Sequence, residues 1–430
     1  MAGTLQQVSP IHGRCMNVDQ NLTVPDDGIG HVPPVQRSVR AFGIYYDGFH
    51  WRKSAEFSRQ RQVLQVESLL MTTDRDGIIQ LSVPMARTLC LDIFRQLAVP
   101  DPEATQTAEI LLEASLRGVD SHGIALLAVF AERIHSGQIH PGRAPFIRRE
   151  GPTTAWIDGQ HGMGPTLAVA AMTLARDKAR RTGLGVVSLY DGNYVGALAG
   201  YVEDPARGGY IALAMANATP RVAPHGGRQG LHGTNPVAWA APAADGEPLL
   251  FDAATGHAAA RIAQAADDGL MIPAGIALDP DGRSTTDPVA ATKGTLLPVG
   301  GALGYGLGLL VDVLTGGLAA APMGRCVPPV TALDGPYGCS FFALVIDPDR
   351  FGGAAALAAS VAALRESART TPAAEGVDAV RAPGDRARAT RKKRLAEGIP
   401  YTRRRWHGLL QRLAACGLDI SWAAAIDPST

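Results

Sequence analysis

The segment RGVDSHG, residues 117–123, carries the side chains best suited to moving a proton. Ser121 and His122 are adjacent in it, and it follows a stretch with helical periodicity. An imidazole titrates near neutral pH, so His122 could pass a proton to a nascent alkoxide or amine. A histidine in such a place can equally cap a helix end. The residue types therefore permit acid/base chemistry without requiring it.

Glycine-rich turns could supply a second kind of chemistry, because they let backbone N–H groups approach phosphates. They are DGQHGMG (158–164), DGNYVGALAG (191–200), HGG (225–227), GLHGTNP (230–236) and GGALGYGLG (300–308). None is a GxGxxG placed between a strand and a helix, so the Rossmann fingerprint is missing. By themselves the turns indicate an α/β protein that could bind a nucleotide.

The periodicity around these segments predicts the elements that must position them. Helices are expected at 89–97, from Asp101 with that residue as its cap, and at 126–134. Strands then alternate with helices, which argues for an α/β architecture. The expected strands are 154–159, 184–190, 210–217, 236–242, 248–255 and 339–348, and the expected helices are 166–182, 305–318 and several near the C-terminus.

The composition excludes several classes of protein. Forty basic residues balance forty acidic ones, so no net field attracts nucleic acid or an anionic membrane. The longest apolar stretches are too short or too rich in glycine to span a bilayer, and the first residues do not form a secretion signal. Five scattered cysteines without a CxxC pair favour a reduced, cytoplasmic protein with no metal site.

A basic run near the C-terminus, Arg386 to Arg394 with 403–405, allows two interpretations. It could bind anions such as nucleic acid. The favoured interpretation is the solvated face of surface helices whose apolar side chains face inward, namely Leu395, Leu409, Leu410 and Leu413.

Longer motifs occur in a defined order: SHG, HGTNPVAWAAP, FDAAT, IPAGIALDPDGRSTTDP, LLPVGG and GYGLGLLVDVLTGGL. This order resembles that of the malate/L-lactate dehydrogenase-like family, from about Ile78 to Asp419. The resemblance implies an α/β, non-Rossmann NAD(P)-binding fold, also called sulfolactate dehydrogenase-like, with helical N- and C-terminal parts. It further implies NAD or NADP as cofactor, a small-molecule substrate, and a homodimer with its active site near the subunit interface.

The resemblance also implies a reaction and an organisation. Hydride would move between the nicotinamide and a 2-keto or 2-hydroxy acid, or a related cyclic-imine carboxylate. Residues 1–77 lie before this resemblance and show no sustained apolar period before Val63, so they are expected to be an extension, either flexible or the result of an upstream start, or a partner-binding arm. Residues 78–150 would be a helical part with the SHG motif, 151–335 the cofactor-binding α/β domain, and 336–430 a strand and helices that return to the N-terminal part.

Individual roles follow from the same resemblance. Ser121 and His122 match an acid/base pair, and Thr234 matches a substrate contact. The segments that match a cofactor-lining region are Val195, Gly196, Ala197, Asp252, Ala253, Ala254, Leu303 and Gly304.

The sequence departs from the family pattern at several of these positions. Tyr194 stands where relatives carry a histidine, Leu303 where they carry a lysine, and Leu126 where they carry a carboxylate-binding arginine. Tyr194 could donate a proton if a nearby cation lowers its pKa, but no such cation is identifiable from the sequence. Candidates that could replace the lost cations are Arg117, Arg221, Arg228 and Arg261.

Two main hypotheses remain. The first is an active NAD(P)-dependent oxidoreductase with a changed substrate, in which His122 is the acid/base group and Tyr194 an auxiliary donor. The second is a repurposed member of the family without redox activity, either a non-redox enzyme or a protein that binds a metabolite or partner. A nucleic-acid binder using the basic run is a third, less favoured interpretation. The sequence leaves the substrate, the direction and the choice between NAD and NADP open.

Overall fold

The computed structural model describes residues 77–267 and 269–424, and these fall within one contact unit. The extension expected at 1–77 therefore lies outside the described residues except for Gly77. The expected divisions at 150/151 and 335/336 remain predictions.

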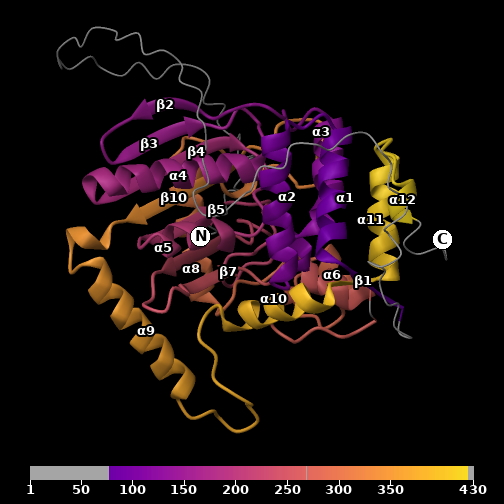
Figure 1. Cartoon of the computed structure of the whole chain (residues 1–430). Coiled ribbons are helices and arrows are strands. Elements are labelled where there is room, and N and C mark those ends of the chain that lie inside the picture. The colour runs from indigo at the N-terminus through magenta and orange to yellow at the C-terminus, as the bar shows by residue number, and fades with distance from the viewer. Residues whose placement is uncertain (1–76, 268, 425–430) are drawn as a thin grey trace, which may run out of the picture. The chain divides into compact units, whose positions relative to one another are not determined.

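One side of the molecule is a helical layer built from both ends of the described chain (Figure 1). Its members pack around one apolar core, in which the Phe94 and Phe130 rings meet edge to face at 6.1 Å. The members are β1 (Ile78–Leu81), α1 (Val83–Gln96), α2 (Asp101–Leu116), α3 (Leu127–His135), β11 (Ile399–Thr402), α11 (Arg403–Ala415) and α12 (Ser421–Ala424). Strands β1 and β11 pair antiparallel, Ile79 opposite Tyr401, and so join segments far apart in sequence.

The predicted helices of this layer are present, with one correction at a cap. Asp101 is the first residue of α2 rather than its cap. Pro100 occupies the cap position because its extended backbone turns the chain into the helix, and the Asp101 side chain makes no capping hydrogen bond. A carboxylate in the first turn still interacts favourably with the helix dipole.

The other side of the molecule is a mixed sheet of seven strands in the described part of the chain. Its order is β2–β3–β4–β10–β5–β6–β7, and of its neighbouring pairs β3–β4 is parallel and the others are antiparallel. The strands are β2 (Phe146–Glu150), β3 (Thr154–Asp158), β4 (Leu184–Gly192), β5 (Ile211–Ala216), β6 (Pro236–Ala241), β7 (Leu249–Ala254) and β10 (Cys339–Ile346). All six strands predicted between 154 and 348 are thus confirmed, and the fold is α/β.

Helices cover both faces of this sheet. The helices α4 (Gly164–Thr182) and α5 (Ala199–Arg207) share a core with one face. On the other face lie α8 (Ala302–Asp312) and the wide turn that follows it, η4 (Val313–Gly317), where Val311 packs on Met215 and Phe342. The expected helix 305–318 therefore starts earlier and ends as a π-turn.

Smaller elements complete the structure. A lobe with its own small core holds α6 (Ala259–Asp267), β8 (Ala277–Leu278), α7 (Pro288–Lys293) and β9 (Thr295–Leu296). The helix α9 (Ala354–Thr370) extends away from the sheet (Figure 1). Short turns are η2 (Asp120–His122), η3 (Ile124–Leu126), η5 (Gly324–Cys326) and η6 (Pro348–Arg350).

The basic run forms α10 (Asp385–Glu397) and the start of α11. Leu409, Leu410 and Leu413 are buried as expected. The inward placement expected for Leu395 is wrong, since it is 48% exposed. The α10 arginines explain this orientation, because Arg391 pairs with Glu113 of α2 at 2.7 Å and Arg394 with Asp120 of η2. The helix thus turns a charged face toward the helical layer.

Candidate active site

The SHG motif forms a tight turn between α2 and α3. The Ser121 hydroxyl lies 2.8 Å from Nδ1 of His122, so the two side chains are hydrogen-bonded. Glycine is required at 123 because a Cβ there would stand 2.0 Å from the Ser115 hydroxyl. That hydroxyl accepts the backbone N–H of Ile124 at 3.0 Å. The turn is therefore fixed at its base, while Ser121 is exposed and the His122 side chain is partly buried.

His122 and Tyr194 face each other across this turn. Their ring centroids are 6.0 Å apart, and Gly196 lies against the His122 backbone. Burial lowers the pKa of His122 below its ordinary value of 6.5 because it disfavours the imidazolium. The imidazole is therefore neutral at neutral pH. Bonding of Nδ1 to Ser121 leaves Nε2 to act on a substrate.

Tyr194 belongs to the loop between β4 and α5. The loop passes over the start of α4, where a Cβ on Gly164 would come within 2.2 Å of the Tyr194 carbonyl. Burial raises the pKa of the Tyr194 phenol, and the nearby Tyr337 also raises it, whereas Arg133 and Arg221 lower it. The phenol therefore stays protonated at neutral pH, and the two arginines offset only part of the shift, so on balance its pKa is raised rather than lowered as sequence reasoning required for a donor. Arg133 is the cation that sequence reasoning missed.

The predicted cofactor residues on β7 and in the loop before α5 lie side by side. The Asp252 carboxylate accepts the N–H of Ala199 at 2.8 Å, at the start of α5. Burial raises the pKa of Asp252 to about 6. Ala253 and Ala254 pair with β6, and Val195 is buried under Tyr201, whose hydroxyl donates to its carbonyl.

Thr234 sits where the GTNP segment meets the end of β7. Its carbonyl accepts the N–H of Thr255 at 2.9 Å. The next residue, Asn235, donates to Asp312 at 3.0 Å and to the Gly308 carbonyl at 2.8 Å, which ties the segment to α8. The GTNP motif therefore holds Thr234 against the cofactor-matching strand and helix.

The Arg117 side chain forms ion pairs with two carboxylates of the protein itself. Its guanidinium, at the C-terminal end of α2, pairs with Glu113 of that helix at 3.4 Å and with Glu203 of α5. The contact with Glu203 joins the helical layer to the sheet side. Arg117 therefore ties the site together, and its predicted contact with a substrate remains a proposal.

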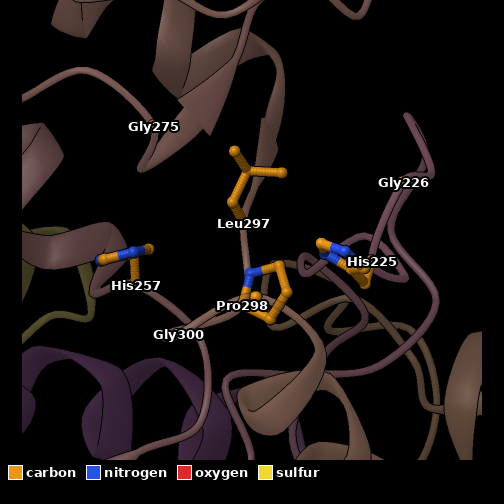
Figure 2. Close-up of a pocket in the computed structure, with 8 residues that line it drawn as sticks. His225, Gly226, His257, Gly275, Leu297, Pro298 and Gly300 are labelled. Atoms are coloured by element: carbon orange, nitrogen blue, oxygen red, sulfur yellow. The ribbon is translucent and has the colours of Figure 1, made fainter.

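The start of α8 borders a cavity of about 380 Å³ (Figure 2). His225 and His257 stand on opposite sides of it, with Leu297 and Pro298 between them. Gly300 and Gly301 line it with positive φ angles of 64° and 62°, a backbone that glycine adopts without strain. The first N–H groups of a helix have no partners within the helix, so this turn offers donors to a phosphate.

Leu303 and Gly304 lie in the first turn of α8. A Cβ on Gly304 would stand 2.1 Å from the Val299 carbonyl, so the helix and the preceding loop meet in close contact there. Leu303 points outward and is 71% exposed. The space at Gly304 is thus filled by the protein's own backbone, and the N–H groups that could meet a phosphate are those of the turn at Gly300 and Gly301 beside the cavity.

Arg221 connects the cavity to Tyr194. It is exposed, and its charge acts on the phenol of Tyr194. Its carbonyl accepts the N–H of Leu296, next to the cavity residue Leu297, and His225 follows four residues later. Among the four candidate replacement cations, Arg221 is the one that the structure brings to both regions.

Within 77–424, apart from the gap at 268, we find no group of three His, Cys, Asp or Glu side chains that could hold a metal ion. No helix in that part of the chain has the length and apolar content needed to cross a membrane.

The sequence is similar to a known family profile and to characterised proteins. Residues 81–410 match a profile described as malate/L-lactate dehydrogenase. The chain is 33% identical over 339 residues to the malate/(S)-sulfolactate dehydrogenase of Methanothermus fervidus, covering 78% of this chain and 98% of that protein. It is 33% identical to a Δ1-pyrroline-2-carboxylate/Δ1-piperideine-2-carboxylate reductase of Pseudomonas syringae, covering 72% and 90%.

Solved structures agree with the sequence comparison. The sulfolactate dehydrogenase of Methanocaldococcus jannaschii superposes with a TM-score of 0.73 at 31% identity, covering 79% of this chain and 98% of that one. A dehydrogenase from Sinorhizobium meliloti gives a TM-score of 0.73 at 34% identity, covering 80% and 99%.

Proposed function

The chain belongs to the malate/L-lactate dehydrogenase family, and from this premise we propose that it is an NAD(P)-dependent oxidoreductase. Its substrate would be a 2-keto or 2-hydroxy acid or a cyclic-imine carboxylate, the classes on which its named relatives act. The observation that carries the proposal is the hydrogen-bonded Ser121–His122 pair facing Tyr194, because it supplies proton donors and acceptors at one place.

The side chains would divide the work as follows. A bound nicotinamide supplies or accepts the hydride. In the direction of oxidation the neutral His122 would take the hydroxyl proton through Nε2, passed on by Tyr194, while Ser121 holds the ring through Nδ1. In the direction of reduction the same path would run in reverse: Tyr194 donates a proton to the oxygen or nitrogen that becomes anionic, and His122 returns a proton to the phenolate. Arg221 is our candidate for binding the substrate carboxylate.

The cofactor would lie along the glycine-lined start of α8. Its phosphates would meet the N–H groups of the turn at Gly300 and Gly301, and the residues 195–197 and 252–254 would line the rest of the molecule. The leucine at 303 brings no charge to this turn, so backbone donors and the flanking histidines would carry the phosphate contacts. NAD and NADP both remain candidates.

We also propose a homodimer. On α8 the apolar side chains of Leu303, Leu307 and Leu310 are exposed, and their spacing places them on one helix face. An apolar stripe on a helix is usually covered by a partner. A second copy of the chain would cover it and bring the partner's surface next to the cofactor turn.

A titration of the purified protein with NADH and with NADPH, followed by nicotinamide fluorescence, tests the cofactor. A panel of 2-keto acids and cyclic-imine carboxylates then tests turnover. His122→Ala should lower kcat by about 10²–10⁴ without removing cofactor binding. His135→Ala is the matched control, because His135 is an exposed histidine at the end of α3. Absence of both nicotinamide binding and turnover would refute the proposal.

A second candidate is a repurposed family member without redox activity. It is favoured by the apolar residues at two positions where relatives carry cations, the exposed Leu303 and the buried Leu126. This candidate predicts that neither nicotinamide binds and that His122→Ala leaves the biological activity unchanged. Nicotinamide-dependent turnover that His122→Ala abolishes would exclude it.

A further inference from the structure

Arg133 is a buried cation close to the proposed site. It lies in the last turn of α3 with no exposed surface. In the described part of the chain its hydrogen bonds go to neutral groups, namely the Asn193 amide oxygen at 2.6 Å, the Val330 carbonyl at 3.0 Å and the Tyr337 side chain, and to no carboxylate. A buried charge without a counter-ion is costly, so its retention needs an explanation.

The same amide oxygen connects Arg133 to Tyr194. Oδ1 of Asn193 also accepts the backbone N–H of Tyr194 at 2.9 Å. The amide nitrogen of Asn193 donates to the Gln138 carbonyl at 3.2 Å, so the Asn193 side chain is fixed at both ends. Arg133 thus anchors, through Asn193, the backbone that carries Tyr194.

The guanidinium also lies beside the Tyr194 ring. Its Cζ is 5.9 Å from the centre of that ring and 4.1 Å from the centre of the buried Tyr337 ring. The His122 ring lies 6.0 Å from the Tyr194 ring. Tyr194 therefore stands in contact with an imidazole and a guanidinium.

We propose that Arg133 is a positioning residue for Tyr194: it orients the phenol through Asn193 and stabilises the phenolate that forms when Tyr194 donates its proton. The proposal rests on the function proposed above. In the direction of reduction, hydride addition leaves an anionic substrate oxygen. The Tyr194 O–H bond then breaks as the substrate O–H bond forms, and the negative charge moves to the phenolate beside Arg133.

The groups that face Tyr194 come from several elements. They are His122 of η2, Arg133 of α3, Arg221 of the loop before GTNP, Tyr337, and Cys339 of β10. Burial raises the pKa of the phenol, as do Tyr337 and Cys339, and the two arginines act in the opposite sense. Because Arg133 is the arginine that is buried, solvent screens its charge least.

An activity-independent experiment tests the contact. Protein labelled with ¹³C at the tyrosine Cζ atoms gives one resonance per tyrosine, and Tyr194→Phe identifies that of Tyr194. Arg133→Gln should shift this resonance, and Arg133→Lys should shift it less. Arg365→Gln is the matched control, because Arg365 of α9 is also buried but pairs with Asp245 of the connection between β6 and β7. A Tyr194 resonance unchanged in Arg133→Gln overturns the proposal.

A double-mutant cycle tests the role in catalysis. With a substrate found in the panel, Arg133→Gln should lower kcat about 10- to 100-fold with little change in the Kd of the nicotinamide. In a Tyr194→Phe background the same substitution should have no further effect, whereas additive losses overturn the proposal. If the wild-type protein shows no nicotinamide-dependent turnover, the proposed function fails, and the resonance experiment alone decides whether Arg133 holds Tyr194.

Discussion

His122 shows how a residue's surroundings decide what it can do. Its position in an SHG turn fixes Nδ1 on Ser121 and leaves Nε2 available. Burial lowers its pKa, so the neutral ring persists to a lower pH than in a solvated histidine. The same side chain at the surface would be partly charged at the pH where a base is needed.

A pH profile follows from this shift. In the role proposed for it, His122 must be neutral for oxidation, so kcat/KM should fall as the pH drops through a value below 6.5. His122→Ala should lose this acid limb together with most of the rate, while His135→Ala keeps it. An acid limb centred above 6.5, or one that persists in His122→Ala, would contradict the assignment.

The residues of the site differ in how far sequence could predict them. His122, Ser121 and Tyr194 could be predicted as site residues because a sequence motif marks the position of each. Arg133 carries no motif, yet it falls on the buried face of α3 with Phe130, where a charged residue is unexpected. The sequence did contain one indication of Arg133: its helical spacing places a cation on the apolar face of the predicted helix. Its partner Asn193 lies 60 residues further on and could not be inferred from that spacing.

At the scale of elements, one carboxylate joins a strand to a helix. Asp252 of β7 accepts the N–H of Ala199 at the start of α5, and burial raises its pKa from 3.8 to about 6. Between these two values the folded chain holds more protons than the unfolded chain. The free energy of unfolding therefore falls as the pH rises through this window.

Asp252→Asn should remove this dependence, because an amide oxygen can accept the same N–H without a charge. We expect the variant to exceed the wild type at pH 7 by about 1–2 kcal/mol in free energy of unfolding. At pH 4 the two should agree closely. Urea denaturation at both pH values measures this, and an equal difference at both would contradict the explanation.

The helix α10 holds the SHG turn from outside. Arg394 pairs with Asp120, which precedes Ser121, and also bonds the Ser115 carbonyl. Arg394→Ala should release the turn and lower kcat/KM about tenfold, since small displacements of catalytic groups reduce rate. Lys393→Ala is the control, because Lys393 is exposed and pairs within its own helix with Glu397. Equal effects of the two substitutions would show that α10 does not act through the turn.

Elements were predictable where periodicity is strong and not where tertiary contacts override local signals. The six central strands follow from their apolar runs. The helix α5 was missed, because its sequence contains Gly200 and Pro205, and proline inside a helix is normally disruptive. The cap from Asp252 and the packing of Tyr201 and Val202 against the sheet stabilise it nonetheless. The strands β1 and β11 were missed because each is short and each is a strand only because it pairs with the other.

At the scale of the whole molecule, the exposed stripe on α8 predicts the state of assembly. Leu307→Asp should place a charge in the proposed contact between two copies and convert the dimer to monomer. Sedimentation velocity or light scattering measures this. Leu364→Asp is the control, because Leu364 is an exposed leucine on α9, away from the stripe. A wild-type protein that is already monomeric at micromolar concentration would refute the proposed dimer.

The order of the strands in the sheet could not be predicted from the sequence. Each strand could be recognised, but pairing depends on contacts across hundreds of residues, and no local pattern records them. Thus β10 pairs with β4 and β5, which precede it by more than a hundred residues. The sequence correctly predicted that strands alternate with helices. That alternation did not indicate that most neighbouring strands pair antiparallel.

This central place of β10 has a consequence for how the chain is made. During synthesis β4 and β5 leave the ribosome long before residue 346, and until then each has an unpaired edge and an apolar face without its neighbour. The middle of the sheet can close only when most of the polypeptide has been translated. Nascent chains should therefore depend on chaperones until that point, and a stall before residue 339 should yield an aggregating product rather than a smaller folded one.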